Sequence, residues 1–394
     1  MSSIDERTAS LSVLFGVGSL FKRSSGPYLT TLQTAQELRA RGHEVHILGT
    51  RSTNESGPPA DWVGMHTIAF PKIGPSTLHF APRARHWLSR CNLRPDVISL
   101  EGVWLHLFSK IAHWATRQKI PFMITAHGNL NPTALRVSSW KKSLARVWFA
   151  DQLLARAACF HAITEQEYRW VREYGLKQPV CLIPNGVNMP SIEAHDLRPE
   201  FQGRRIALYV GRLHQIKGLD LLLKAWARAA ELHPDWQLIV AGNDDGAQGD
   251  LLALRSSLRL EQSVQFVGPV HGEVKATWLA NCDFFVLPSR SEGLAMAPLE
   301  AMSYGKPVLL TQTSNFPQAA ESGAGFEVAC DVDAIQQGLH AMMDEDEAQR
   351  GAMGAAGRAL VQERYNWRTI CSQLEQVYGW LAGKNPAPAS VRFD

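Results

Sequence analysis

Two glutamates separated by seven residues are the strongest chemical signal in the sequence. Glu292 follows an apolar run that ends at Leu287, and Glu300 falls in a segment expected to begin a helix. Pro298 is compatible with a first helical turn because its missing N–H costs little there. Glu292 is therefore expected on a strand-end loop. Both carboxylates are then predicted in one crevice at the carboxyl ends of the strands, where they can accept hydrogen bonds from sugar hydroxyls.

The loop that joins the two glutamates also predicts an anion site. The backbone amides of Leu294, Ala295 and Met296 are expected to point at an anion near the helix start. Gly293 belongs to the same loop. The segment thus combines groups for a hydroxylated ligand with groups for a phosphate.

A second charged loop follows the apolar run Ile206–Val210. Gly211 permits a tight turn, and Arg212 and Lys217 stand five residues apart beyond it. Arginine offers a planar fork of donors and lysine a compact charge, and both suit a diphosphate. The loop is predicted to bind the phosphates of the same ligand.

Candidate residues also occur in the first half of the chain. Gly26 follows Ser24-Ser25, where loop amides can approach a phosphate, and precedes a helix expected to bury one face formed by Leu29, Leu32, Ala35 and Leu38. His127 stands before a glycine at the end of an apolar run. We treat Glu101 and Trp104 as candidates for contact with a second substrate. A buried, hydrogen-bonded histidine is the alternative interpretation of His127.

These motifs resemble the family 4 (group 1) retaining glycosyltransferases of the GT-B fold. The resemblance rests on E-x7-E, on G-R-x4-K-G, and on a first helix that closes with R-G-H-E-V at residues 41–45. It implies that Glu292 contacts the donor sugar, that Glu300 holds the ribose, and that Arg212 and Lys217 neutralise the leaving diphosphate. It also implies that His127 lies near the reacting carbon. Neither a metal nor a cofactor is expected.

The elements that must position these residues are short apolar runs alternating with longer amphipathic segments. The apolar runs are residues 11–15, 44–48, 96–100, 121–125, 159–164 and 180–184 in the first half and 206–210, 236–241, 264–267, 283–288, 307–311 and 326–329 in the second. Six such β/α units in each half predict an α/β chain with two doubly wound, Rossmann-like domains. We expect an acceptor domain at 1–190 and a donor domain at 191–366. Residues 367–394 are expected to form a helix that returns to the first domain and a loose tail. The resemblance implies that the two domains face each other across a cleft.

Composition excludes several other classes. The chain is 45% hydrophobic and 20% charged, as in globular proteins. Its polar first residues predict a cytoplasmic protein. The six scattered cysteines favour neither a disulfide scaffold nor a zinc site. Two D-x-D patterns, at 331–333 and 344–346, are attributed to helix ends and solvated positions rather than to a metal site.

Charge is divided unequally between the halves. Residues 1–190 carry 22 Lys/Arg against 12 Asp/Glu, and residues 191–394 carry 18 against 25. The segments 83–94 and 135–156 combine arginine and lysine with tryptophan, which predicts contact with an anionic membrane surface or a lipid-linked acceptor. Core tryptophans and solvated charges are the alternative.

The predicted function is transfer of a hexose, with retention, from a UDP- or GDP-linked donor to a hydroxyl acceptor in cell-envelope polysaccharide or glycolipid synthesis. The expected partners are the nucleotide sugar and a saccharide or lipid-linked acceptor, and no nucleic acid is expected. A nucleotide-sugar epimerase of the same fold and an inactive, transferase-like binding protein remain the alternatives.

Overall fold

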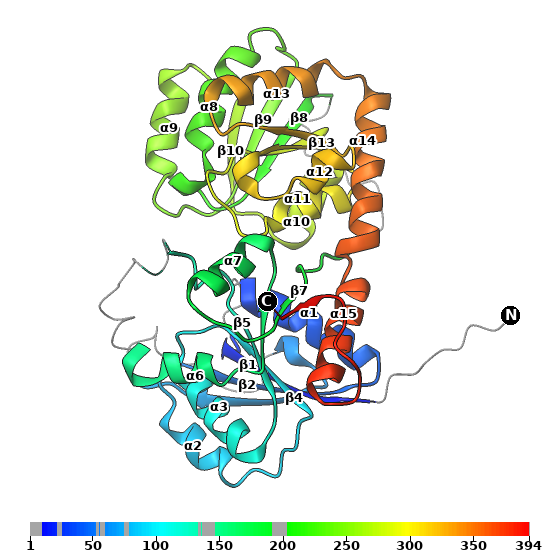
Figure 1. Ribbon diagram of the computed structural model, residues 1–394. Coiled ribbons are helices and arrows are strands. Elements are labelled where there is room, and N and C mark those ends of the chain that lie inside the picture. The colour runs from blue at the N-terminus through cyan, green and yellow to red at the C-terminus, as the bar shows by residue number, and fades with distance from the viewer. Residues whose placement is uncertain are drawn as a thin grey trace, which may run out of the picture. The chain divides into compact units, whose positions relative to one another are not determined.

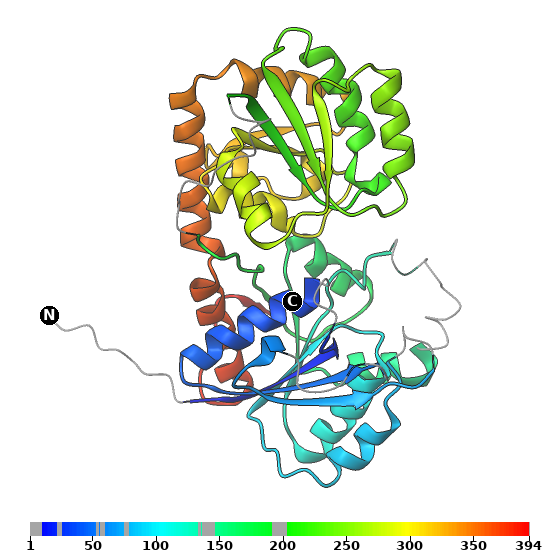
Figure 2. The ribbon, with the colours of Figure 1, turned by 180° about the vertical axis from the view of Figure 1, so that it is seen from behind.

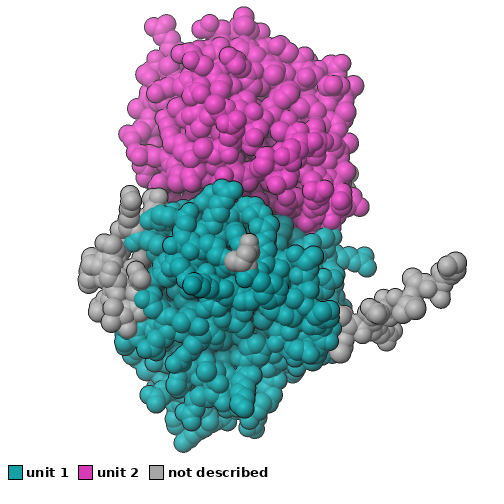
Figure 3. All heavy atoms as spheres, viewed as in Figure 1, with its two compact units in different colours: residues 1–185, 367–394 teal, residues 186–366 magenta. Residues whose placement is uncertain are grey.

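The computed structural model describes residues 10–393 apart from 22–25, 53–54, 56–59, 75–78, 133–134, 136–145 and 191–202. The chain divides into two compact units, which Figure 3 shows in different colours. Unit 1 comprises residues 1–185 and 367–394, and unit 2 comprises residues 186–366. The division falls a little before residue 190, where the sequence predicts it.

Unit 1 is built on an eight-stranded sheet with the order β14-β7-β6-β5-β4-β1-β2-β3, and Figure 1 labels several of these strands. Its strands from β1 to β7 are parallel and mostly continuous apolar runs, as expected for a sheet covered on both faces. Their bounds are β1 Ser12–Ser19, β2 Glu44–Arg51, β3 His66–Pro71, β4 Val97–Glu101, β5 Phe122–Thr125, β6 Cys159–Ala162, β7 Val180–Leu182 and β14 Val391–Arg392.

Helices cover both faces of this sheet, and each face has its own core (Figures 1 and 2). One core includes buried side chains of α2, α3 and α6, and the other includes those of α1 and α15. The bounds are α1 Gly26–Ala40, α2 Pro82–Leu88, α3 His106–Gln118, η2 Arg146–Ala150, α6 Asp151–Ala155, α7 Glu165–Glu173 and α15 Trp367–Leu381, with a short 3₁₀ turn η1 at Ala60–Trp62.

The C-terminal segment belongs to unit 1. α15 packs against α1 and buries Ile370, Leu374 and Val377. Beyond it, the prediction of a loose tail is wrong, because β14 pairs antiparallel with β7 and buries Val391. Two prolines just before this strand hide the pairing from a sequence pattern, since only contact with β7 creates it.

The buried face of α1 also differs in part from expectation. Leu29 is 50% exposed, whereas Tyr28 takes the core position and donates a hydrogen bond from its hydroxyl to Asp61. Leu32 and Leu38 are buried as predicted. At the start of the helix, Tyr28 and not Leu29 therefore faces the core.

Unit 2 is a six-stranded parallel sheet with the order β10-β9-β8-β11-β12-β13. All six strands lie where the apolar runs predict them. The strand bounds are β8 Arg205–Val210, β9 Trp236–Ala241, β10 Val264–Gly268, β11 Phe284–Leu287, β12 Val308–Thr311 and β13 Gly325–Val328. The helix bounds are α8 Leu219–Ala229, α9 Gln248–Ser257, α10 Gly272–Asn281, α11 Met296–Ser303, α12 Gln318–Glu321, α13 Val332–Asp344 and α14 Glu347–Leu360. Shorter turns are η4 Gln215–Lys217, η5 Gln312–Ser314 and η6 Val361–Tyr365.

Both units share the doubly wound order, in which the chain starts in the middle of the sheet and reverses direction once. The reversal lies between β1 and β4 in unit 1 and between β8 and β11 in unit 2. Ligands of open α/β sheets bind at such switch points. In the part of the chain that the structure describes, no helix is long and apolar enough to span a membrane.

Candidate active site

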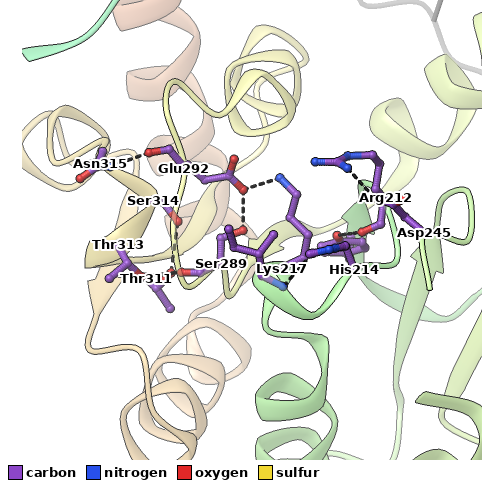
Figure 4. A network of polar contacts seen from close by, with 12 residues as sticks. Arg212, His214, Lys217, Asp245, Ser289, Glu292, Thr311, Thr313, Ser314 and Asn315 are labelled. Carbon is purple, nitrogen blue, oxygen red and sulfur yellow. Dashed lines mark hydrogen bonds and ion pairs between the residues drawn. The ribbon is translucent and has the colours of Figure 1, made fainter. Parts of the chain in front are cut away.

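The switch point of unit 2 collects the predicted donor residues. Since β8 and β11 are neighbours, the loops that follow them meet at one edge of the sheet. The loop after β8 carries Arg212 and Lys217, and the loop after β11 carries Glu292. Figure 4 shows these three side chains within one network of polar contacts.

Lys217 is held by the turn around it. The His214 Nδ1 atom accepts a hydrogen bond from the Ile216 amide at 3.1 Å, which starts η4. Gly218 then adopts φ +68°, and a Cβ there would lie 2.0 Å from the carbonyl oxygen of Pro288. Only glycine allows this approach, so Gly218 fixes Lys217 beside the loop after β11.

Arg212 is positioned by its backbone. The Tyr209 hydroxyl donates a hydrogen bond to the Arg212 carbonyl at 2.9 Å. Burial, followed by the nearby charge of Glu292, raises the pKa of Tyr209, so the hydroxyl stays a donor. A Cβ at Gly211 would lie 2.7 Å from that hydroxyl. The Arg212 side chain is 63% exposed, and its guanidinium pairs with Asp245.

Glu292 lies between a cation and a hydroxyl. Its Oε1 atom accepts hydrogen bonds from Lys217 Nζ at 2.5 Å and from Ser289 Oγ at 2.5 Å. The Glu292 backbone is tied to the loop after β12, because its amide donates to the Thr313 carbonyl and its carbonyl accepts from Asn315 Nδ2. The carboxylate is therefore fixed, while its lysine partner is a flexible chain.

Glu300 lies on α11 and has a lysine partner that the sequence did not suggest. Lys275 Nζ of α10 donates to both carboxylate oxygens, at 2.7 and 2.8 Å. At the start of α11, Ala295 provides no side-chain cap for the first amides. The helix start thus keeps donors that an anion can satisfy.

The unit 2 site therefore consists of cations that are paired with carboxylates. Lys217, Arg212 and Lys275 pair with Glu292, Asp245 and Glu300 respectively. Each pair can exchange partners, the cation binding a phosphate or the carboxylate binding a hydroxyl.

Unit 1 brings together two residues that the sequence proposed separately. His127 Nε2 donates to Glu101 Oε2 at 2.8 Å, and Ser99 Oγ donates to Glu101 Oε1 at 2.7 Å. Burial opposes ionisation of Glu101, but the hydrogen bonds from His127 and Ser99 outweigh it and hold its pKa below the ordinary value. An ionised Glu101 fixes the Nε2–H tautomer of His127, which leaves Nδ1 as an acceptor.

A buried carboxyl group, that of Glu167, supports this histidine. His127 and Gly128 have φ values of +48° and +73°, and the Glu167 side chain hydrogen-bonds to the Gly128 backbone. Glu167 also accepts from the Ile163 amide at 3.0 Å. Burial raises the pKa of Glu167 despite these bonds. No local sequence signal marks this contact, since 39 positions separate Glu167 from Gly128.

The remaining first-half candidates are less informative. Gly26 begins α1, but Ser24 and Ser25 lie outside the described residues. Trp104 lies three residues after Glu101 in the chain, and its Nε1 atom donates a hydrogen bond to the Asn129 carbonyl at 3.3 Å. Trp104 therefore lies on the loop after β4, next to the switch point of unit 1.

The acidic D-x-D patterns lie where the sequence predicts. Asp331 and Asp346 cap α13 and α14 by accepting from the amides three residues on. Asp333 pairs with Arg228 at 2.7 Å, and Asp344 is exposed. Among the described residues, no group of three or more His, Cys, Asp or Glu side chains is arranged to hold a metal.

Two doubly wound domains in one chain define the GT-B architecture, and comparisons with known proteins agree. Residues 192–360 match the family "Glycosyl transferases group 1", and residues 25–186 match the "Glycosyl transferase 4-like domain". The sucrose-phosphate synthase of Thermosynechococcus elongatus superposes with a TM-score of 0.74 at 22% identity, over 94% of this chain and 99% of that one.

Curated relatives also match in sequence. The phosphatidyl-myo-inositol mannosyltransferase of Mycobacterium leprae is 28% identical, over 89% of this chain and 92% of its own length. The GDP-mannose:cellobiosyl-diphosphopolyprenol alpha-mannosyltransferase of Xanthomonas campestris is 27% identical, over 75% of this chain and 77% of its own. The chain belongs to the group 1 glycosyltransferases. Both relatives are transferases, which favours transfer over the epimerase alternative.

Proposed function

We propose that this glycosyltransferase transfers mannose, with retention, from GDP-mannose to a lipid-linked acceptor. The observation that carries donor binding is the set of exchangeable ion pairs at the unit 2 switch point. The choice of GDP-mannose and of a lipid-linked acceptor rests on the names of the two relatives.

In the proposed donor complex the diphosphate replaces two carboxylates. Lys217 and Arg212 leave Glu292 and Asp245 and bind the phosphates, so no metal is required. Glu292 is then available to a sugar hydroxyl and Glu300 to the ribose. The first amides of α11 add donors for the phosphate.

Transfer then proceeds by front-face attack. The bond from the anomeric carbon to the diphosphate oxygen breaks, the bond to the acceptor oxygen forms on the same face, and the leaving phosphate takes the acceptor proton. Positioned cations stabilise the charge that builds on the diphosphate. His127, oriented by Glu101, offers Nδ1 to a substrate hydroxyl.

Peripheral contact with an anionic membrane, at the inner face, is part of this proposal. Arg83, Arg85 and Arg90 are exposed, and so is Trp148 at 55%. Trp87 instead packs edge-on against Phe70 and is partly buried against the hydrophobic core. In the segment 135–156, the side chains of residues 136–147 lie outside the described residues. Sedimentation with anionic and neutral liposomes tests the contact, and recovery in the supernatant with both contradicts it.

The donor is tested by incubating the enzyme with GDP-mannose, UDP-glucose and other nucleotide sugars, each with a lipid-linked acceptor extract. We expect consumption of GDP-mannose and an alpha-linked product, assigned by NMR from its anomeric coupling. Consumption of UDP-glucose alone would leave the transferase in place and contradict the mannosyl assignment. An inverted product would contradict front-face attack.

A further inference from the structure

A basic groove of about 390 Å³ opens among α2, α3, η2 and α6 of unit 1. This volume falls within the range of small-ligand sites. No acidic side chain is among the described residues that line it. Five basic side chains do line it, namely Arg85, Lys110, His113, Arg117 and Arg156.

Helical spacing builds this cationic lining. Lys110, His113 and Arg117 are three and four residues apart on α3, so they share one face of the helix. Arg85 comes from α2 and Arg156 from the end of α6, and both helices pack against α3. Three elements therefore point their cations into one space.

The cations act on one another and are not balanced by a carboxylate inside the groove. Burial, followed by repulsion from Arg156 and Arg117, lowers the pKa of His113. Burial and then the charge of Arg85 lower the pKa of Lys110. Such mutual repulsion costs free energy that a bound anion would remove.

An aromatic rim adjoins the cations. Trp148 is 55% exposed, and its ring lies tilted against that of His106 with the centroids 5.3 Å apart. Burial, and then Lys110, lower the pKa of His106 to about 4, so this ring is neutral and apolar contact is favoured. Phe149 is buried against Trp104, which follows the switch point of unit 1. The rim thus extends from the groove to Trp104, three residues after Glu101 in the chain.

We propose that the groove binds the phosphate or diphosphate of an amphipathic ligand, with the cations on the phosphate and Trp148 on the adjoining apolar chain. The groove is lined by none of the donor-site cations, so this proposal does not depend on the donor site. That its natural occupant is the lipid-linked acceptor rests on the proposed function. Arginine and lysine suit phosphate, and a half-exposed tryptophan suits an apolar chain that enters from solvent.

The test is calorimetric titration of the whole protein at low salt, with GDP present at saturation so that the donor cations are occupied. The probes are inorganic pyrophosphate and geranyl diphosphate, which share the diphosphate and differ in the apolar chain. We expect both to bind, and geranyl diphosphate to bind roughly tenfold more tightly because its chain is partly buried.

Two variants separate the parts of the groove. The double variant Arg85→Gln/Arg117→Gln is expected to weaken both probes by about tenfold or more, from the loss of charged hydrogen bonds. The matched control Arg169→Gln/Lys177→Gln removes the same charge from exposed positions of unit 1 and is expected to change either affinity less than about twofold. Trp148→Ala is expected to weaken geranyl diphosphate only.

Several results would contradict the proposed binding of a diphosphate in the groove. They are absence of binding to the wild-type protein, equal weakening by the test and control variants, or equal affinity for the two probes. GDP affinity, measured on the same proteins, is expected to stay at the wild-type value in every variant. If the wild-type protein did not bind GDP, the result would contradict the proposed donor site and not the proposed binding in the groove.

Discussion

The two switch points share the doubly wound strand order, and their charge pairs differ in number and in exposure. In unit 1 the His127–Glu101 pair is buried, with side-chain exposures of 10% and 9%. In unit 2 the Arg212–Asp245 pair is exposed at 63% and 43% and the Lys275–Glu300 pair at 29% each, whereas the Lys217–Glu292 pair, at 16% and 11%, is nearly as buried as the pair of unit 1. Buried pairs hold a geometry, whereas exposed pairs of flexible side chains exchange partners cheaply.

This difference suits the two sheet edges to different roles. In the proposed donor complex, Arg212 leaves an exposed pair and Lys217 a more buried one to bind the diphosphate, whereas the unit 1 edge holds the His127 ring against Glu101. One topology therefore supports two chemistries because the loops, and not the strands, carry the side chains.

The largest effect is expected for Lys217→Ala. This change removes a cation from the leaving diphosphate and leaves Glu292 without its lysine. We expect kcat/KM to fall about 100- to 1,000-fold, the range for losing one positioned group that stabilises transition-state charge. Steady-state kinetics with GDP-mannose measures it. Lys224→Ala, on the exposed side of α8, is the control and should keep wild-type activity.

The two glutamates of unit 2 are expected to separate in kinetics. Glu292→Ala should lower kcat about 100-fold, because a sugar contact that strengthens in the transition state is lost. Glu300→Ala should raise the KM for the donor about tenfold with a smaller change in kcat. Reversed phenotypes would show that sugar and ribose have been assigned to the wrong carboxylates.

A smaller effect is expected in unit 1 from Glu101→Gln. The amide no longer fixes the tautomer of His127, although it keeps the shape of the side chain. We expect kcat to fall about tenfold or more, as for a misplaced reacting group, with donor KM little changed. A change confined to donor KM would contradict a role for His127 in the reacting geometry.

The smallest effect concerns the partner of Arg212. Asp245→Asn removes a competing carboxylate from an exposed pair. We expect GDP to bind up to about fivefold more tightly, which corresponds to the upper end of about 1 kcal/mol for exposed pairs. Calorimetry measures the change, and weaker binding would show that Asp245 supports Arg212 instead of competing for it.

The sequence predicted the parts of the fold and site that depend on local pattern. Continuous apolar runs located all six strands of unit 2, and the charged motifs therefore fell correctly on the loops after β8 and β11. In unit 1 the edge strand β3 was missed, because His66 and Thr67 interrupt its apolar pattern. β14 was missed since it exists only through β7.

The partners of the site residues could not be predicted, for a related reason. Lys275 reaches Glu300 across 25 positions, and Asp245 reaches Arg212 across 33. Their meeting depends on how α10 and the loop after β9 pack, which short motifs do not encode. A polar residue near a strand end indicates an edge of the sheet, but not its neighbour across that edge.

The central claim is that the unit 2 cations bind the donor diphosphate without a metal. Calorimetric titration of GDP into the wild-type protein, with a chelator in excess, tests it most directly. We predict that binding persists under chelation and weakens by roughly 1.5–3 kcal/mol in Lys217→Ala, as for a lost charged hydrogen bond. Binding that disappears with the chelator and returns with added magnesium would contradict the account.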